Sequence, residues 1–152
     1  MIKKHVFIQW DARLTHGVQL IDSQHKKLVT LTNTLYLACL EDREAANCCF
    51  IEVAREMVNY VHYHFSTEEH MMRFLMYPDY HNHRMEHERF VKEILRQTML
   101  FEQHKNLVPH RYVLFLKDWI LSHIAVRDKT LANHIRYIED QEKVQIVFSK
   151  PA

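Results

Sequence analysis

The scarcity of residues that interrupt helices constrains this chain more than any other feature of its sequence. Its 152 residues include one glycine, Gly17, and three prolines. Glycine and proline are the residues that most often end helices and form tight turns. So few of them predict long helices joined by short loops, in a chain whose length fits one domain with one core.

Apolar residues recur at intervals of three and four along four segments, the spacing that places them on one face of a helix. The predicted helices run from Leu20 to about Leu40, from about Ala45 to Leu75, from about His81 to Lys105, and from near His110 to as far as about Gln141. The second helix ends before Pro78, because the residue preceding a proline disfavours helical conformation. We therefore predict an all-α, antiparallel up-down-up-down four-helix bundle with an N-terminal arm.

We expect one domain over residues 1–152, divided into three parts. Residues 1–18 lack helical periodicity and are predicted to form the arm. Residues from about 20 to 128 are predicted to form the bundle core, and residues 129–152 a C-terminal extension.

Charge and hydropathy argue against several classes of function. The formal net charge is +1, with acidic and basic residues mixed along the chain, so nothing predicts binding to nucleic acid or to an anionic membrane. No apolar run approaches the roughly 20 residues that a membrane-spanning helix needs. The first 17 residues lack the apolar stretch and the small-residue cleavage site of a signal peptide. A cytoplasmic protein is therefore the expectation.

The cysteines do not predict a disulfide framework. Cys39, Cys48 and Cys49 are odd in number and contain no C-x-x-C pair. Thiols in a reducing compartment are the simpler interpretation. A redox role for the adjacent Cys48 and Cys49 is the alternative.

Thirteen histidines are the second unusual feature of the sequence. Side chains four residues apart, such as His64 and Glu68 or His83 and His87, point the same way from a helix. Each predicted helix brings at least one imidazole to the bundle axis: His25 from the first, His64 from the second, His83 and His87 from the third, and His123 from the fourth.

Five imidazoles inside a core would lose their hydration, which is costly unless each finds a partner. Metal ions remove that cost, because neutral imidazole nitrogens are good ligands. Five nitrogens are too many for one tetrahedral zinc ion, which takes four ligands. Two ions that share bridging carboxylates fit the count, and Glu68 and Asp128 are the candidate bridges. Such di-metal carboxylate sites occur in the interiors of helix bundles.

One spacing does not fit a regular helix. His123 and Asp128 are five residues apart, which places them about 140° apart around an ideal α-helix. For both to reach one site, the helix must bulge or turn, or Asp128 must approach from the flank. A single π-type turn would bring them together, and such turns are frequent at functional sites.

Four segments carry motifs that are specific enough to compare with a known family. They are W-x4-TxGVxxIDSQHKKL (Trp10 to Leu28), HFxxEE (His64 to Glu69), YPxxxxHxxxHxxF (Tyr77 to Phe90) and WxxxHIxxxD (Trp119 to Asp128). Together they resemble the hemerythrins, in particular the bacterial single-domain form. The resemblance covers about residues 10 to 130. All seven ligand positions of the family hold the expected residue types in the expected order.

The resemblance implies a site with two iron ions (Fe2+/Fe3+) and a bridging oxo or hydroxo group. His83, His87 and His123 would hold one iron, His25 and His64 would hold the other, and Glu68 and Asp128 would bridge the pair. The iron with two histidines would have an open coordination position, where dioxygen would bind reversibly. The resemblance therefore implies oxygen storage, transport or delivery, and not an enzyme.

Apolar residues close to the ligand positions are candidates for the walls of an oxygen pocket, which must exclude water and protons. They are Leu28, Phe65, Trp119, Ile120 and Ile124. Ordinary core packing is the alternative role for each of them.

Eight further histidines fall off the predicted inner faces or in loops, and we expect them to be solvated. They are His5, His16, His62, His70, His81, His104, His110 and His134.

Two other functions are consistent with the same seven ligands. In the first, the chain is a sensing module, in which oxygen or the redox state of the irons alters a surface read by an unidentified protein partner. The chain shows no output domain, so a partner would have to supply the response. In the second, the chain removes peroxide or nitric oxide.

Overall fold

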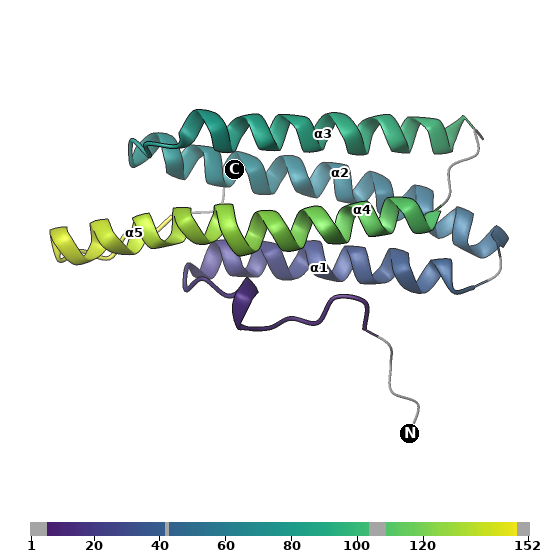
Figure 1. Ribbon diagram of the computed structural model, residues 1–152, viewed down its shortest axis with the longest axis horizontal. Helices are drawn as coiled ribbons and strands as arrows, with labels where there is room; N and C mark the ends of the chain where they lie inside the picture. The colour runs from purple at the N-terminus through teal and green to yellow at the C-terminus, as the bar shows by residue number, and fades with distance from the viewer. Residues whose placement is uncertain (1–5, 42, 104–108, 149–152) are drawn as a thin grey trace, which may run out of the picture.

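The protein is described here by a computed structural model that covers residues 6–41, 43–103 and 109–148, without the side chains of residues 43–46, 48 and 49. Its elements are η1 (Ala12–Leu14), α1 (Gln19–Cys39), α2 (Arg43–Phe74), α3 (Tyr80–Glu102), α4 (Pro109–Ser122), η2 (His123–Asp128) and α5 (Lys129–Glu142). The helices α1, α2 and α3 and the continuous segment from α4 to α5 lie side by side (Figure 1). The part of the chain that the structure describes contains no strand. The predicted all-α four-helix bundle is confirmed.

The fourth helical segment of the bundle consists of three consecutive elements. The helix α4 passes into the π-helical turn η2, and α5 continues from it without a break. In Figure 1, α5 extends beyond the other three helices at one end of the bundle. The π-type turn proposed between His123 and Asp128 is thus present over those two residues and the four between them.

Two groups of buried apolar side chains form the core, and the helix α2 contributes to both. Val61 and Phe65 belong to the larger group, whereas Met71 and Met72 belong to the smaller one. The residues of α2 between Phe65 and Met71 include buried Glu68. The fold therefore places polar groups of α2 between two apolar regions, away from bulk water.

The N-terminal arm runs along α1 and is tied to it at several points. The backbone N–H of Ile8 donates to Asn33 Oδ1 at 2.8 Å, and Asn33 Nδ2 donates back to the Ile8 carbonyl at 2.9 Å. The ring of Phe7 stacks on that of Tyr36, with 4.2 Å between centroids. Ile8 is itself buried in the larger apolar group, so this segment is packed against the bundle.

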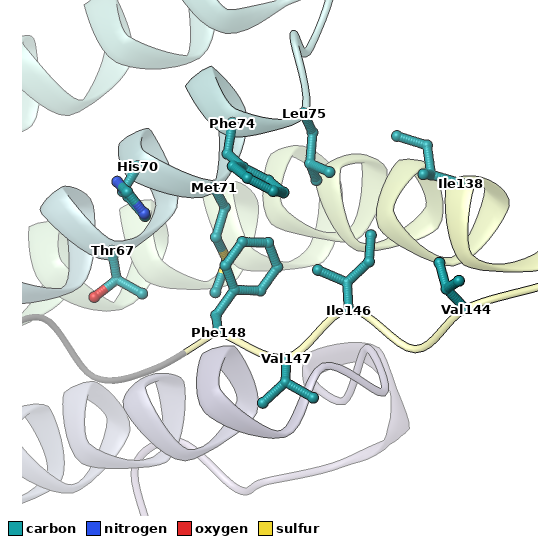
Figure 2. A pocket seen from close by; sticks show the side chains of 10 residues that line it. All are labelled: Thr67, His70, Met71, Phe74, Leu75, Ile138, Val144, Ile146, Val147 and Phe148. Carbon is teal, nitrogen blue, oxygen red and sulfur yellow. The ribbon is translucent and has the colours of Figure 1, made fainter. Parts of the chain in front are cut away.

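The chain reverses direction after α5 and returns toward the end of α2. Lys143 adopts the left-handed conformation (φ 51°) that ends α5, and the Ile146 N–H donates to Glu139 Oε1 at 2.9 Å. Figure 2 shows Phe148 beside Phe74 and Met71, whereas Val147 points away from them.

A cavity of about 770 Å³ lies between this returning segment, the last turns of α2, and α5 (Figure 2). Its lining is mostly apolar and includes Thr67 and Phe148.

Within the described residues, no helix has the length and hydropathy needed to cross a membrane.

Candidate metal centre

The seven predicted ligands come together in the middle of the bundle, and each is buried. They are His25, His64, Glu68, His83, His87, His123 and Asp128, none of them more than 3% exposed. Donor atoms of these residues form two groups, each within 4.8 Å. One group contains three histidines with Glu68 and Asp128, and the other contains two histidines with the same two carboxylates.

In the larger group, three imidazole Nε2 atoms surround one oxygen of each carboxylate. His87 Nε2 lies 3.2 Å from Glu68 Oε2, and His83 Nε2 lies 3.6 Å from the same oxygen. His83 Nε2 and His123 Nε2 each lie 3.1 Å from Asp128 Oδ1. The three nitrogens and two oxygens therefore face a common point.

The smaller group uses the other oxygen of each carboxylate. His25 Nε2 lies 2.9 Å from Asp128 Oδ2 and 3.8 Å from Glu68 Oε1. His64 Nε2 lies 3.5 Å from the same Glu68 oxygen. Because each carboxylate presents one oxygen to each group, Glu68 and Asp128 have the arrangement that bridges two cations.

The π turn explains how His123 and Asp128 reach the same group from one helix. A π turn contains one more residue than an α-helical turn, so side chains five residues apart come onto nearly the same face. The 3.1 Å distance from His123 Nε2 to Asp128 Oδ1 follows from this geometry.

The donor set passes a simple test of fit to metal ions. All four carboxylate oxygens of Glu68 and Asp128 are buried, and none accepts a hydrogen bond of good geometry from the described residues. Both ring nitrogens of His25 are likewise buried without a hydrogen bond of good geometry to the described residues. Buried polar atoms almost always make well-directed hydrogen bonds. These atoms lack such bonds and lie around two common points, so cations placed there would satisfy them. Imidazole and carboxylate donors together suit iron and other transition metals.

Without metal, protons on histidines offset the negative charge of the buried carboxylates, and the effect is largest at His25 and His83. Burial acts against a charged imidazole at His25, but the carboxylates of Asp128 and Glu68 outweigh it and raise the pKa to about 9. The same balance raises the pKa of His83 to about 10. At His64 burial dominates and lowers the pKa to about 4.

The pKa values of the two carboxyl groups shift in the opposite direction, downward. Burial acts to raise the pKa of both Glu68 and Asp128, but the surrounding imidazoles hold both values well below the ordinary range. At neutral pH, two buried carboxylates therefore face protonated imidazoles at His25 and His83. Metal ions would replace these protons, because an imidazole must be neutral to coordinate.

The free energy of unfolding of the metal-free protein is expected to fall as the pH rises from 6.5 toward 10. A group with a raised pKa stabilises the fold below its unfolded pKa, and this contribution disappears as the pH passes the folded value. The unfolded pKa of both His25 and His83 is 6.5, and the folded pKa is about 9 for His25 and about 10 for His83. Urea unfolding with a chelator at about pH 7 and about pH 9.5 measures the change. Equal stability at both pH values would contradict the charge balance described above.

Partners outside the two groups orient several of the histidines. His64 Nδ1 lies 2.9 Å from Gln24 Oε1, and Gln24 Nε2 donates to Thr67 Oγ1 at 3.1 Å. His87 Nδ1 lies 3.1 Å from Glu69 Oε1. Such contacts fix the tautomer and the ring orientation of a ligating histidine.

The outer contact of His123 belongs to a longer network of charges. His123 Nδ1 lies 3.2 Å from Glu86 Oε2, and Arg127 Nη2 lies 2.5 Å from the other oxygen of Glu86. Arg127 also contacts Asp79 at 3.0 Å. The hydrogen bond with His123, together with Arg127, lowers the pKa of Glu86 to about 2. The carboxylate is therefore charged and available to accept the proton on His123 Nδ1.

The sequence did not identify Gln24, Glu69 and Glu86 as partners of the histidines. Gln24 and Glu69 each adjoin a predicted ligand, and Glu86 immediately precedes His87. Helical spacing placed the ligands on inner faces but assigned no role to the residues beside them. Adjacency to a predicted ligand was the available signal for all three.

Aromatic rings cover two of the histidines of the larger group. The ring of Phe65 stacks on His87 with 3.7 Å between centroids and 4° between planes. Trp119 stacks on His123 with 4.2 Å between centroids, and Phe90 stacks on Trp119 at 3.8 Å. These stacks restrict rotation of both imidazoles and keep water from their faces.

Two of the five candidate wall residues, Phe65 and Trp119, stack on proposed ligands. Leu28, Phe65, Ile120 and Ile124 are buried in the larger apolar group, and half-buried Trp119 packs against it. These residues thus pack in the apolar core, which was the alternative role predicted for them. Their role in an oxygen pocket stays a prediction.

The remaining histidines differ from one another in their surroundings. His62, His70, His81 and His110 are exposed, as expected, whereas His5 and His104 lie outside the described residues. The prediction that His16 is solvated is wrong, because it is only 3% exposed. Its Nε2 lies 2.7 Å from the carbonyl of Ile124, which satisfies a buried ring that helical periodicity could not place. His134 is half-buried, with its ring 5.1 Å from that of Tyr77.

Comparison with known proteins gives a consistent result. The family model described as "Hemerythrin HHE cation binding domain" matches residues 16–135. A bacteriohemerythrin of Pseudomonas paraeruginosa is 30% identical over 128 residues, which are 84% of this chain and 81% of that protein. One from Campylobacter jejuni is 28% identical over 124 residues, 82% of this chain and 90% of that protein.

Solved structures support the same fold. A crystal structure described as wild-type hemerythrin superposes with a TM-score of 0.77. It is 24% identical in sequence, and the alignment covers 84% of this chain and 96% of that one.

Proposed function

This chain belongs to the hemerythrin family, and on that premise we propose that it binds dioxygen reversibly at a pair of iron ions. The larger donor group would hold one iron through His83, His87 and His123, and the smaller group would hold the other through His25 and His64. Glu68 and Asp128 would bridge the two ions. The physiological role would be storage, transport or delivery of oxygen.

The observation that carries this proposal is that the two donor groups differ in their number of histidines. Both groups share two carboxylates, but one has three histidines and the other has two. The group with fewer protein donors leaves room for an external molecule, as open metal sites do. When bound, the iron pair would supply the electrons that dioxygen takes up reversibly.

The composition of the donor set favours binding over oxidation of a substrate. Five imidazoles outnumber two carboxylates here, whereas ferritin-like di-iron sites use Glu-x-x-His pairs and are richer in carboxylates. Fewer anionic donors stabilise highly oxidised metal states less well. The proposed chemistry is therefore uptake and release.

The protein's own residues would protect the bound gas from water and protons. Leu28, Ile120 and Ile124 are each at most 1% exposed, and each follows or precedes a proposed ligand by one to four residues; we propose that they form the apolar wall of the site. An apolar wall of this kind slows protonation and hydrolysis at a reactive centre. The stacked ring of Phe65 closes the same region on the side of His87.

Repeated oxygenation tests the proposed function. The iron-loaded protein is reduced without oxygen, exposed to air and then purged with argon over several cycles, while visible absorption and oxygen uptake are recorded. The proposal predicts uptake of about one dioxygen per two irons and return of the original spectrum. Irreversible oxidation in the first cycle would favour removal of peroxide or nitric oxide instead.

A sensing function is the second candidate, because hydrogen bonds lead from the centre to a cavity that the C-terminal segment also lines. His64 contacts Gln24, Gln24 donates to Thr67, and Thr67 lines the cavity beneath Phe148. A shift of His64 on oxygen binding would move Gln24 and Thr67 and so alter the wall of the cavity on which this segment lies. A partner protein would then read the changed surface.

Hydrogen exchange of residues 144–148 distinguishes the two candidates. Sensing predicts that oxygenation changes the exchange of these amides, and that Thr67→Val weakens the change because the Gln24 contact is lost. Exchange that is identical in the oxygenated and deoxygenated protein would exclude this route and leave oxygen storage or delivery as the function.

A further inference from the structure

A histidine outside the seven proposed ligands reaches the π turn from the N-terminal arm. His16 is 3% exposed, and its Nε2 lies 2.7 Å from the backbone carbonyl of Ile124, inside η2. A carbonyl only accepts, so His16 Nε2 carries the proton in this hydrogen bond. The ring also lies edge-on to that of His25, with 5.8 Å between centroids.

The backbone around His16 is fixed by charged side chains from two other elements. Both oxygens of Asp22 accept hydrogen bonds from it, one from His16 N–H at 2.8 Å and one from Gly17 N–H at 3.0 Å. Arg136 Nη1, from α5, donates to the His16 carbonyl at 2.7 Å. The backbone that carries the imidazole is therefore held in place from α1 and from α5.

Gly17 permits this close approach of the arm to α5. Its φ is +85°, and a Cβ atom at this position would lie 3.0 Å from Arg136 Nη1. A side chain would strain the backbone and crowd the guanidinium. The only glycine of the chain thus lies where the arm brings His16 to the π turn.

The π turn needs such support because it is less favourable than a regular helical turn. The N–H of Lys129 bonds the carbonyl of Ile124, five residues earlier, and that of Val126, three residues earlier, instead of a carbonyl four residues earlier. Short π segments of this kind are rare and occur mostly at functional sites. In a regular α-helix with the same five-residue spacing, Asp128 would lie about 140° from His123 around the axis and would point away from the centre.

We propose that His16 is a positioning residue that holds the π turn in register, so that Asp128 presents one oxygen to each donor group. The hydrogen bond satisfies the second lone pair of the Ile124 carbonyl, whose first accepts from Lys129. This role depends on the proposed iron centre only through Asp128. It does not depend on whether oxygen binds there.

Two variants and one control test this role. His16→Leu fills the same space without a donor, and His16→Gln restores an N–H of similar reach. Thr98→Val is the control, since Thr98 is also buried and its hydroxyl also donates to a helix carbonyl, that of Ile94, within α3. It removes one buried hydrogen bond away from the centre.

The first readout is amide hydrogen exchange at Lys129 in the iron-free protein, and the second is the rate at which a chelator removes iron from the loaded protein. His16→Leu is expected to accelerate both on the order of tenfold, the lower range for loss of an outer contact at a metal site. His16→Gln is expected to restore both rates. Thr98→Val is expected to leave both unchanged, even if it lowers thermal stability equally.

Unchanged exchange and iron release in His16→Leu would overturn the proposal, and so would failure of His16→Gln to restore them. Neither readout uses oxygen. A protein that fails to bind dioxygen but shows the expected rates would therefore refute the proposed function and leave the role of His16 intact.

Discussion

An Asp128→Ala variant is expected to lose the metal pair. Asp128 is fully buried, and its two oxygens lie 3.1 Å and 2.9 Å from donors of the two separate groups. Its removal takes one ligand from each metal position and a negative charge that offsets both cations. We expect iron affinity to fall by more than the 10- to 100-fold typical of outer contacts. Iron analysis after dialysis against a weak chelator measures this loss.

The same substitution should weaken the iron-free protein. Loss of one partner from a buried, charged cluster costs about 3 kcal/mol, because the histidines that faced Asp128 lose the carboxylate that stabilises their charged form. Asp118→Ala is the matched control, since Asp118 is an exposed carboxylate on α4. It should retain two irons and full stability. Two tightly bound irons in Asp128→Ala would overturn the bridging assignment.

A Phe65→Ala variant is expected to separate protection of the centre from simple stability. Phe65 is 4% exposed and stacks on His87. Truncation of a buried phenylalanine costs about 3 to 5 kcal/mol of stability. Here it also opens a space beside a proposed ligand, so water should enter and shorten the lifetime of the oxygenated protein.

Phe50→Ala supplies the comparison for this variant. Phe50 is 1% exposed and packs against Tyr112 and Phe101, among residues that do not belong to either donor group. It should lose a similar amount of stability by urea unfolding without a change in the lifetime of the oxygenated form. Equal shortening of that lifetime in both variants would show that loss of stability alone is responsible.

Helical periodicity was sufficient to predict the bundle and to place six of the seven buried polar residues on inner faces; Asp128 was the exception. Apolar spacing indicates which face of a helix lies inside, and a polar residue on that face must find a partner there. The five-residue spacing of His123 and Asp128 conflicted with a regular helix and indicated that an irregular turn was one way to bring both residues to the site. That conflict had several solutions, and the structure shows the π turn.

Periodicity gave no information about segments that are not helical. His16 lies in such a segment, so no face could be assigned to it, and it was wrongly expected in solvent. The return of the chain from Lys143 to Phe148 depends on a left-handed residue at the end of α5 and on apolar contacts with α2. Contacts between distant segments of this kind depend on tertiary packing, which local patterns do not encode.

Resonance Raman spectroscopy of the reduced, iron-loaded protein after addition of isotopically labelled oxygen tests the central claim most directly. Reversible binding at the di-iron centre predicts a vibrational band that shifts with the oxygen isotope and disappears when oxygen is removed. Conversion to an oxidised protein with no isotope-sensitive band would contradict it.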